Sequence, residues 1–123
     1  MINKELVQEI KTHNWRRSWL DFSIFSYDRG CLVISASDDL SYYHTMEITL
    51  ITPTFIHGVT DWSCDVNEDF INYISEKNML SFFSDNERTF SVIADKILVN
   101  FDTVFYYPRE NLTTGQRLAY WLE

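Results

Sequence analysis

The sequence contains little glycine and proline, with three glycines and two prolines among 123 residues. Linkers, low-complexity tails and long disordered segments are usually rich in these residues, so the composition argues against all three. Apolar residues make up 46% of the chain, which is enough to fill a hydrophobic core, and the length suits one domain. We therefore expect residues 1–123 to form a single folded domain.

Cysteine and long apolar runs are also scarce. The chain has two cysteines, Cys31 and Cys64, and no apolar run approaches the roughly 18 residues that a membrane-spanning helix needs. The N-terminal residues lack the basic and then apolar pattern of a signal peptide. We expect a cytoplasmic protein that does not associate with a membrane. Both thiols should be free, because a reducing compartment disfavours disulfides.

Motifs that would identify an enzyme are missing. Three glycines can hardly build a phosphate-binding loop or a dinucleotide-binding turn, and no nucleophile elbow occurs. The three histidines are at least 13 residues apart, which is not a spacing typical of zinc ligands. Cys64 lies close to Asp61 and Asp65, whose charges disfavour a reactive thiolate. We expect no catalytic residue, no bound metal and no cofactor.

The hydrophobic pattern predicts an α+β fold. Residues 3–13 carry apolar side chains at helical spacing, and Asn3 is a suitable N-cap. Residues 20–25 and 31–37 flank a turn at residues 28–30 and predict a β-hairpin, because glycine at position 30 can supply a positive φ. Alternation of apolar and polar residues predicts further strands at 42–51, 55–57, 89–94, 96–101 and 103–107.

Two more helices complete the predicted fold. Residues 67–78 begin and end with asparagines that suit helix termini, and apolar side chains between them form a stripe. Thr113 and Gln116 have the spacing of a capping box, which predicts a last helix. We expect a mostly antiparallel, curved sheet of six or seven strands with N-terminal, middle and C-terminal helices. The sheet either wraps around the helices or forms a partly open barrel.

Basic residues are nearly absent from the middle of the chain. Residues 36–87 hold ten acidic residues and one base, Lys77, so the net charge of −8 comes from this segment. Binding to nucleic acid or to an anionic membrane needs clustered Lys and Arg, and we expect neither. A basic protein partner is favoured, because a negative field speeds its association. The alternative is that the acidic residues serve only solubility.

Three segments resemble small acidic immunity proteins of bacterial polymorphic and contact-dependent toxin systems: residues 42–49 (YYHTMEIT), 90–94 (FSVIA) and 104–111 (VFYYPREN). The resemblance implies a non-catalytic protein that binds and neutralises a cognate toxin domain, commonly a basic nuclease. Carboxylates would then take the place of the phosphates that the nuclease binds. Such interfaces depend on a few aromatic anchors with polar groups around them. The residues that we expect to bind the partner are Tyr42, Tyr43 and Trp62 as anchors and Asp38, Asp39, Asp61, Asp65, Glu68 and Asp69 as carboxylates.

Several alternatives stay open. Trp62 could instead be a core residue. The chain could be a phage anti-defence protein that mimics nucleic acid, or a small ligand-binding protein or enzyme that uses a cavity of the curved sheet. His44 or His57 would then be among its polar groups, although His44 is otherwise expected to be a hydrogen-bonded residue near the end of the sheet. The chain could also form a homo-oligomer through an exposed edge strand, and acidic repulsion would make that association salt dependent.

Overall fold

The computed structural model describes residues 2–122. Its elements in chain order are α1 (Asn3–Thr12), β1 (Trp19–Asp28), β2 (Cys31–Ser37), β3 (Tyr43–His44), β4 (Met46–Gly58), β5 (Asp61–Asp65), β6 (Ile71–Ile74), the 3-10 helix η1 (Ser75–Lys77), β7 (Met79–Ser84), β8 (Glu87–Asn100), β9 (Thr103–Phe105), β10 (Gln116–Leu118) and the 3-10 helix η2 (Tyr120–Leu122).

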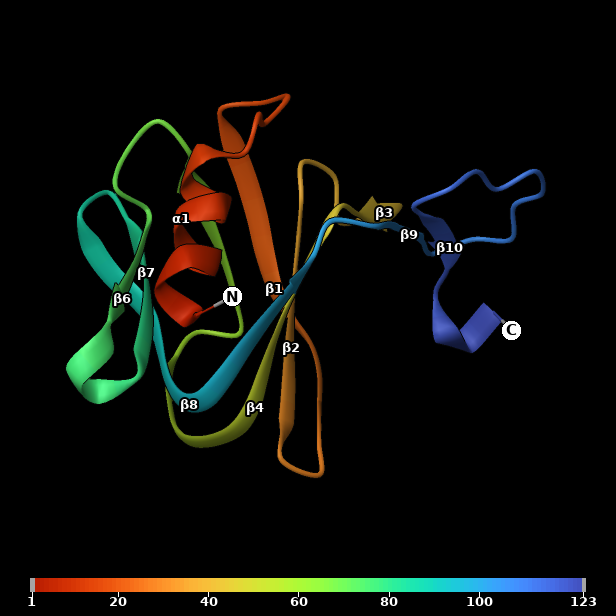
Figure 1. Ribbon diagram of the computed structural model, residues 1–123. Helices are drawn as coiled ribbons and strands as arrows, with labels where there is room; N and C mark the ends of the chain where they lie inside the picture. The colour runs from red at the N-terminus through yellow and green to blue at the C-terminus, as the bar shows by residue number, and fades with distance from the viewer. Residues whose placement is uncertain (1, 123) are drawn as a thin grey trace.

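The predicted α+β class and the curved antiparallel sheet are confirmed. Seven strands form one sheet in the order β5-β1-β2-β4-β8-β7-β6, and every neighbouring pair is antiparallel. The sheet curls into a half barrel, and α1 packs against β6 and β8 inside the curl (Figure 1). A second sheet, in the order β10-β9-β3, stands to one side and carries the C-terminal part of the chain.

The hairpin of β1 and β2 agrees with the sequence. Asp28 pairs with Cys31, and the two turn residues Arg29 and Gly30 both have positive φ, at 48° and 73°. Two positive φ values are typical of the turn whose twist matches that of a two-stranded ribbon. A register shift between Ile24 and Ser26 interrupts the ladder, so the residue between them, Phe25, is a bulge.

Strands β4 and β8 are long and bend together at the bottom of the half barrel (Figure 1). The predicted strands 89–94 and 96–101 are one continuous strand, β8. The predicted strands 42–51 and 55–57 are likewise joined in β4, except that residues 43–44 form β3 of the second sheet. In β4 a register shift between Pro53 and Phe55 accommodates the proline, which cannot donate to the ladder. Near the end of β4, Gly58 has φ 134° and lies so close to Thr89 that a Cβ would meet its carbonyl oxygen at 2.2 Å. A glycine is therefore required there.

The prediction of three helices is wrong, because α1 is the one α-helix among residues 2–122. Residues 71–74 of the predicted middle helix pair with β7 as β6, and Asn78 adopts a left-handed φ of 53° in the turn between them. The same apolar residues can form a strand when a pairing strand follows closely in the chain, as β7 does here. The β-branched isoleucines in this segment also favour a strand. In the C-terminal segment, Gly115 has φ 81° and leads into β10 rather than into a helix.

Asn3 does not cap α1, although the sequence suggested it. The residue before the helix is Ile2, and Asn3 is its first residue. The side chain of Asn3 instead donates a hydrogen bond to the Tyr73 hydroxyl at 2.9 Å and accepts one from the Ile97 backbone N–H at 3.1 Å. It therefore connects the helix to both β6 and β8.

Aromatic rings fill one end of the core. Trp62 is 7% exposed and lies between two rings that are nearly parallel to it. Its ring centre is 5.6 Å from that of Phe22 and 4.7 Å from that of Phe90, with interplanar angles of 2° and 10°. Phe82 packs on the same tryptophan at 5.1 Å. The structure therefore places Trp62 in the core, where its ring links β5 to β1, β7 and β8.

We expect Trp62→Ala to lower the free energy of unfolding by about 3–5 kcal/mol, because it leaves a large cavity in the aromatic stack. Trp19→Ala is the matched control, since Trp19 is 51% exposed on the neighbouring strand and should cost less than about 1 kcal/mol. Urea denaturation followed by far-ultraviolet circular dichroism measures both variants. Equal losses for the two would contradict the core position of Trp62.

Candidate functional site

An acidic groove lies on the outer face of β5, β1 and β2. Alternation along β1 and β5 turns Phe22 and Trp62 toward the core and leaves Asp21, Asp61 and Ser63 on the outer face. The loop that follows β2 borders the same face. The groove has a volume of about 500 Å³ and is lined by Asp21, Phe22, Asp38, Asp39, Leu40, Ser41, Asp61, Trp62 and Ser63.

Hydrogen bonds hold two of the groove's carboxylates in place. Ser63 Oγ donates to Asp21 Oδ1 at 2.6 Å, and the Tyr43 hydroxyl donates to Asp38 Oδ1 at 2.7 Å. The hydrogen bond to Asp38, together with burial, raises the pKa of Tyr43 above its ordinary value, so this hydroxyl remains a donor at neutral pH. These two carboxylates are therefore oriented before any partner arrives.

The other two carboxylates accept hydrogen bonds from residues close to them in the sequence. Asp39 accepts a hydrogen bond from the Ser41 backbone N–H at 3.2 Å, and Asp61 accepts one from Thr60 Oγ1 at 3.0 Å. Among the described residues that line the groove, none is a lysine or an arginine. At the rim, Arg17 Nε lies 3.5 Å from Asp38 Oδ2, and the arginine side chain is largely exposed. The groove is therefore suited to a cationic group.

The structure brings together some of the residues that the sequence singled out. Asp38, Asp39, Asp61 and Trp62 line the same groove, but Trp62 is almost entirely buried. Little of its side chain is accessible to a partner, so it is poorly placed to act as an anchor.

The other predicted partner-binding residues lie elsewhere. Asp65 is at the far end of β5 and accepts a hydrogen bond from the Asn67 backbone N–H at 2.9 Å. Glu68 and Asp69 are in the loop before β6, where Asp69 pairs with Lys11 of α1 at 3.0 Å. Tyr42 is exposed and packs against Tyr107 beside the small sheet, and Tyr43 lines a different cleft.

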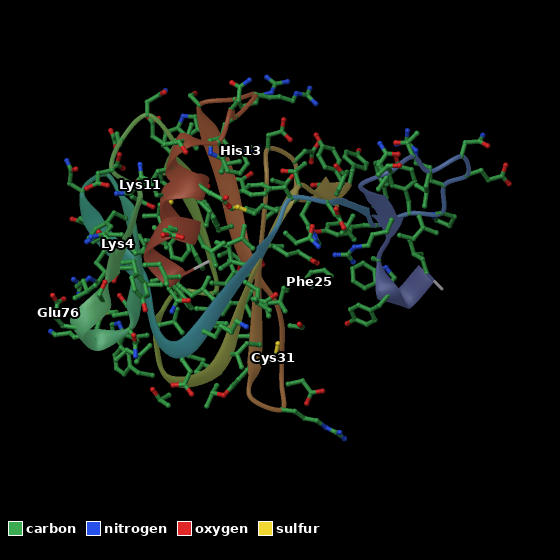
Figure 2. The ribbon with its side chains drawn as sticks, viewed as in Figure 1. Lys4, Lys11, His13, Phe25, Cys31 and Glu76 are labelled. Carbon is green, nitrogen blue, oxygen red and sulfur yellow. The ribbon has the colours of Figure 1, made fainter. Side chains whose placement is uncertain are left out.

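The carboxylates of the middle segment do not form one continuous face. Glu76 lies in η1 on the β6 side of the molecule, as Figure 2 shows. Asp85 and Glu87 are at the turn between β7 and β8, and Glu47 points to the C-terminal sheet. The acidic groove is therefore a local concentration of charge around four aspartates.

A second cleft continues from the acidic groove and has aromatic walls. It has a volume of about 340 Å³, shares Leu40 and Asp61 with the groove, and is otherwise lined by Ser23, Ile24, Phe25, Ser35, Tyr106 and Trp121. We call it the aromatic cleft. The bulge residue Phe25 lies on the side of the main sheet that faces the C-terminal segment (Figure 2). Its ring centre is 6.3 Å from that of Tyr106 and 5.7 Å from that of Trp121.

A buried polar network holds the wall of the aromatic cleft. His44 is fully buried, with Nε2 2.9 Å from Glu47 Oε2 and Nδ1 2.6 Å from the Tyr106 hydroxyl. The other oxygen of Glu47 accepts a hydrogen bond from Arg117 of β10, and Arg117 Nε is 3.6 Å from Asp102. The expectation that His44 is a hydrogen-bonded residue is confirmed. The network joins β4 of the main sheet to the C-terminal segment.

The charge of Glu47 fixes the direction of these hydrogen bonds. Burial acts to raise the pKa of Glu47, but the hydrogen bonds and charges of His44 and Arg117 outweigh it and hold this pKa below its ordinary value of 4.5. An ionised Glu47 accepts only, so His44 Nε2 donates to it. In the neutral imidazole, Nδ1 then accepts a hydrogen bond from the Tyr106 hydroxyl.

Hydroxyl, imidazole and carboxylate in this order resemble the arrangement that activates a nucleophile. Burial, however, raises the pKa of Tyr106 to about 12, which favours the neutral phenol over a nucleophilic phenolate. The pKa of Cys64 is also raised to about 12, again chiefly by burial, so its thiol is unreactive. Burial, rather than the neighbouring aspartates considered from the sequence, is the main cause for Cys64. The network is therefore best explained as a structural connection.

Within residues 2–122, no group of three or more His, Cys, Asp and Glu side chains is arranged to hold a metal ion. In the same part of the chain, no helix has the length and apolar character needed to cross a lipid bilayer.

Sequence reasoning missed Asp21, Phe25, Tyr106 and Trp121 as residues of these clefts. Alternation along residues 20–25 places Asp21 and Phe25 on the face opposite to Leu20 and Phe22, but it does not indicate what they meet there. No local pattern indicates that β5 lies beside β1, or that Tyr106 and Trp121 pack on Phe25.

We expect Glu47→Gln to lower the free energy of unfolding at pH 7 by about 1.5–3 kcal/mol, because it removes charged hydrogen bonds to His44 and Arg117. A carboxylate with a lowered pKa stabilises the folded state above the ordinary value of 4.5, and this contribution is lost as the pH falls below it. The difference between wild type and variant should therefore shrink below pH 4.5. Urea denaturation at pH 7 and at successively lower pH measures it, and a constant difference would contradict this role.

Comparison of the chain with models of protein families, with curated proteins and with solved structures found no match.

Proposed function

We propose that the chain is a non-catalytic cytoplasmic immunity protein that binds and neutralises a basic toxin domain through the acidic groove. The observation that supports this most directly is the groove's lining, in which all charged side chains are carboxylates: Asp21, Asp38, Asp39 and Asp61. A groove of this kind binds lysine and arginine side chains and disfavours nucleic acid and anionic lipid.

The preorganisation of the carboxylates favours a protein partner. Each of the four already accepts a hydrogen bond from a neighbouring residue, so little side-chain entropy is lost when a cation binds. A cleft that binds nucleic acid presents clustered Lys and Arg, and carboxylates fixed in space can take the place of phosphates there. The long-range attraction between the two surfaces would also speed capture of the toxin.

The aromatic cleft supplies the apolar area that such an interface needs. Trp121 is exposed and lines it, and Tyr42, although outside both clefts, is exposed directly after Ser41, which lines the acidic groove. Exposed aromatic residues beside a charged surface commonly dominate the binding energy. We propose Trp121 and Tyr42 as anchors in place of Trp62, because Trp62 belongs to the core.

The open shape of both clefts favours this function over small-molecule binding. Sites for small ligands enclose most of the ligand surface. The acidic groove instead lies open along the outer face of the sheet. A phage anti-defence protein would use the same acidic groove, and its target would be a host nuclease rather than a toxin from a neighbouring gene.

The experiment reverses the charge of two groove residues, Asp39→Lys and Asp61→Lys, in one variant. We expect its association rate with the proposed basic toxin domain to fall at least about tenfold at low salt, because the steering field is lost. The effect should diminish at high salt. Co-expression with the toxin should then no longer protect growth. Surface plasmon resonance at about 50 to 500 mM NaCl measures the association rates.

The matched control is Glu76→Lys with Glu87→Lys, which changes the net charge equally at exposed positions outside the groove. If the association rate falls by the same factor in both double variants, net charge rather than the groove determines capture of the toxin. An unchanged rate in the groove variant, with the fold intact, would refute the proposed site.

A further inference from the structure

One stretch of the main sheet has no neighbouring strand. β2 pairs with β4 only as far as Ile51, whereas β8 continues to pair with β4 up to Gly58. Residues 55–58 of β4 are therefore paired on one side only, and Thr54 before them is left out of the ladder by the register shift. All five of residues 54–58 are exposed. We call them the free edge. In Figure 1 they belong to the bend of β4, which forms the lower rim of the half barrel.

The two outermost strands of the same sheet are covered. α1 packs against β6, where Asn3 donates a hydrogen bond to Tyr73. The curl of the sheet brings β7 beside β5, and Ser84 Oγ donates to the carbonyl oxygen of Ser63. Proteins usually cover or charge their sheet edges because unpaired backbone groups attract other strands. The free edge differs from both outermost strands in this respect.

The ladder with β8 determines which backbone groups are available. Val59 N–H donates to the carbonyl of Thr89 at 3.2 Å, so this pair is a hydrogen-bonded one. Because bonded and non-bonded pairs alternate in an antiparallel ladder, Phe55 and His57 face β8, and Ile56 and Gly58 point their N–H and C=O groups away from it. Within residues 2–122, no strand pairs with β4 at these outward positions.

The free edge is also apolar and uncharged. Phe55 and Ile56 are exposed large hydrophobic residues, and Val59 follows directly. Residues 48–60 contain no Asp, Glu, Lys or Arg, although the chain has a net charge of −8. Two copies of such an acidic chain repel each other least where the contact is free of charge. A cationic partner is also not attracted electrostatically to an uncharged strand, and should bind at the acidic groove instead.

We propose that two copies of this chain pair through their free edges as antiparallel strands, with the two-fold axis at Ile56. In this register Ile56 faces its own copy and exchanges two hydrogen bonds with it, and Gly58 faces Thr54 of the partner subunit. The inference does not depend on the proposed toxin binding.

The side chains are self-complementary in this register. Phe55 and His57 already stack within one strand, with ring centres 6.1 Å apart and an interplanar angle of 8°. Antiparallel pairing places Phe55 opposite the partner's His57, so the four rings lie on one face of the joined sheets. Cross-strand aromatic pairs of this kind stabilise a two-stranded contact. The contact is short, so we expect a concentration-dependent dimer.

The first test measures mass in solution. We expect the mass of the purified chain in sedimentation equilibrium to rise from 14.7 kDa toward about twice that value as its concentration increases from micromolar to millimolar. The rise should begin at lower concentration in 500 mM than in 50 mM NaCl, because salt screens the repulsion between the copies. A chain that remains monomeric at all concentrations would refute the proposal. This holds even if a different protein binds the free edge.

The second test locates the contact. Ile56→Lys should abolish the rise in mass, because it puts two like charges at the two-fold axis. Leu98→Lys is the matched control: Leu98 is 44% exposed, against 37% for Ile56, and lies on β8 inside the sheet. The Leu98→Lys variant should dimerise like the wild type. Amide hydrogen exchange of the unmodified chain should slow at Ile56 and Gly58 as concentration increases. Dimerisation without this protection would show another interface and overturn the proposal.

Discussion

The structure depends on the curl of the seven-stranded sheet. β4 and β8 bend together, and this bend brings β5 beside β7 so that the sheet surrounds its own core. The stack of Phe22, Trp62 and Phe90 fills the space between strands from the two ends of the sheet. The same curl turns the polar residues of β1 and β5 outward on a convex face. β1 and β5 therefore contribute to the core with one face and to the acidic groove with the other.

The sequence predicts faces more reliably than neighbours. Alternation in residues 20–25 correctly separates Phe22 from Asp21, because a strand turns successive side chains to opposite faces. Asp21 meets Ser63 only because β5 pairs with β1, and alternation contains no information on strand order. The sequence therefore identified Asp38, Asp39 and Asp61 as charged positions but missed Asp21, which completes the groove.

The errors have a common physical origin in tertiary contacts. Residues 71–74 have apolar residues that suit a helix, yet the adjacent strand β7 supplies hydrogen bonds to them as a strand. His44 bonds to Tyr106, which is 62 residues away, and Glu47 bonds to Arg117, which is 70 residues away. No local pattern predicts such pairs. The interior position of Trp62 was one of two interpretations, and only the partners of β5 decide between them.

The attachment of the C-terminal sheet has a consequence for the order in which the molecule opens. This sheet stands to one side of the half barrel (Figure 1). Its contacts with the half barrel include the aromatic rings around Phe25 and the hydrogen bonds that Glu47 accepts from His44 and Arg117. It contributes few residues to the main core. A unit joined in this way can detach in a sub-global opening while the half barrel stays folded. Trp121 and Tyr106 would leave with it, so one wall of the aromatic cleft has a lower local stability than the four aspartates beside it.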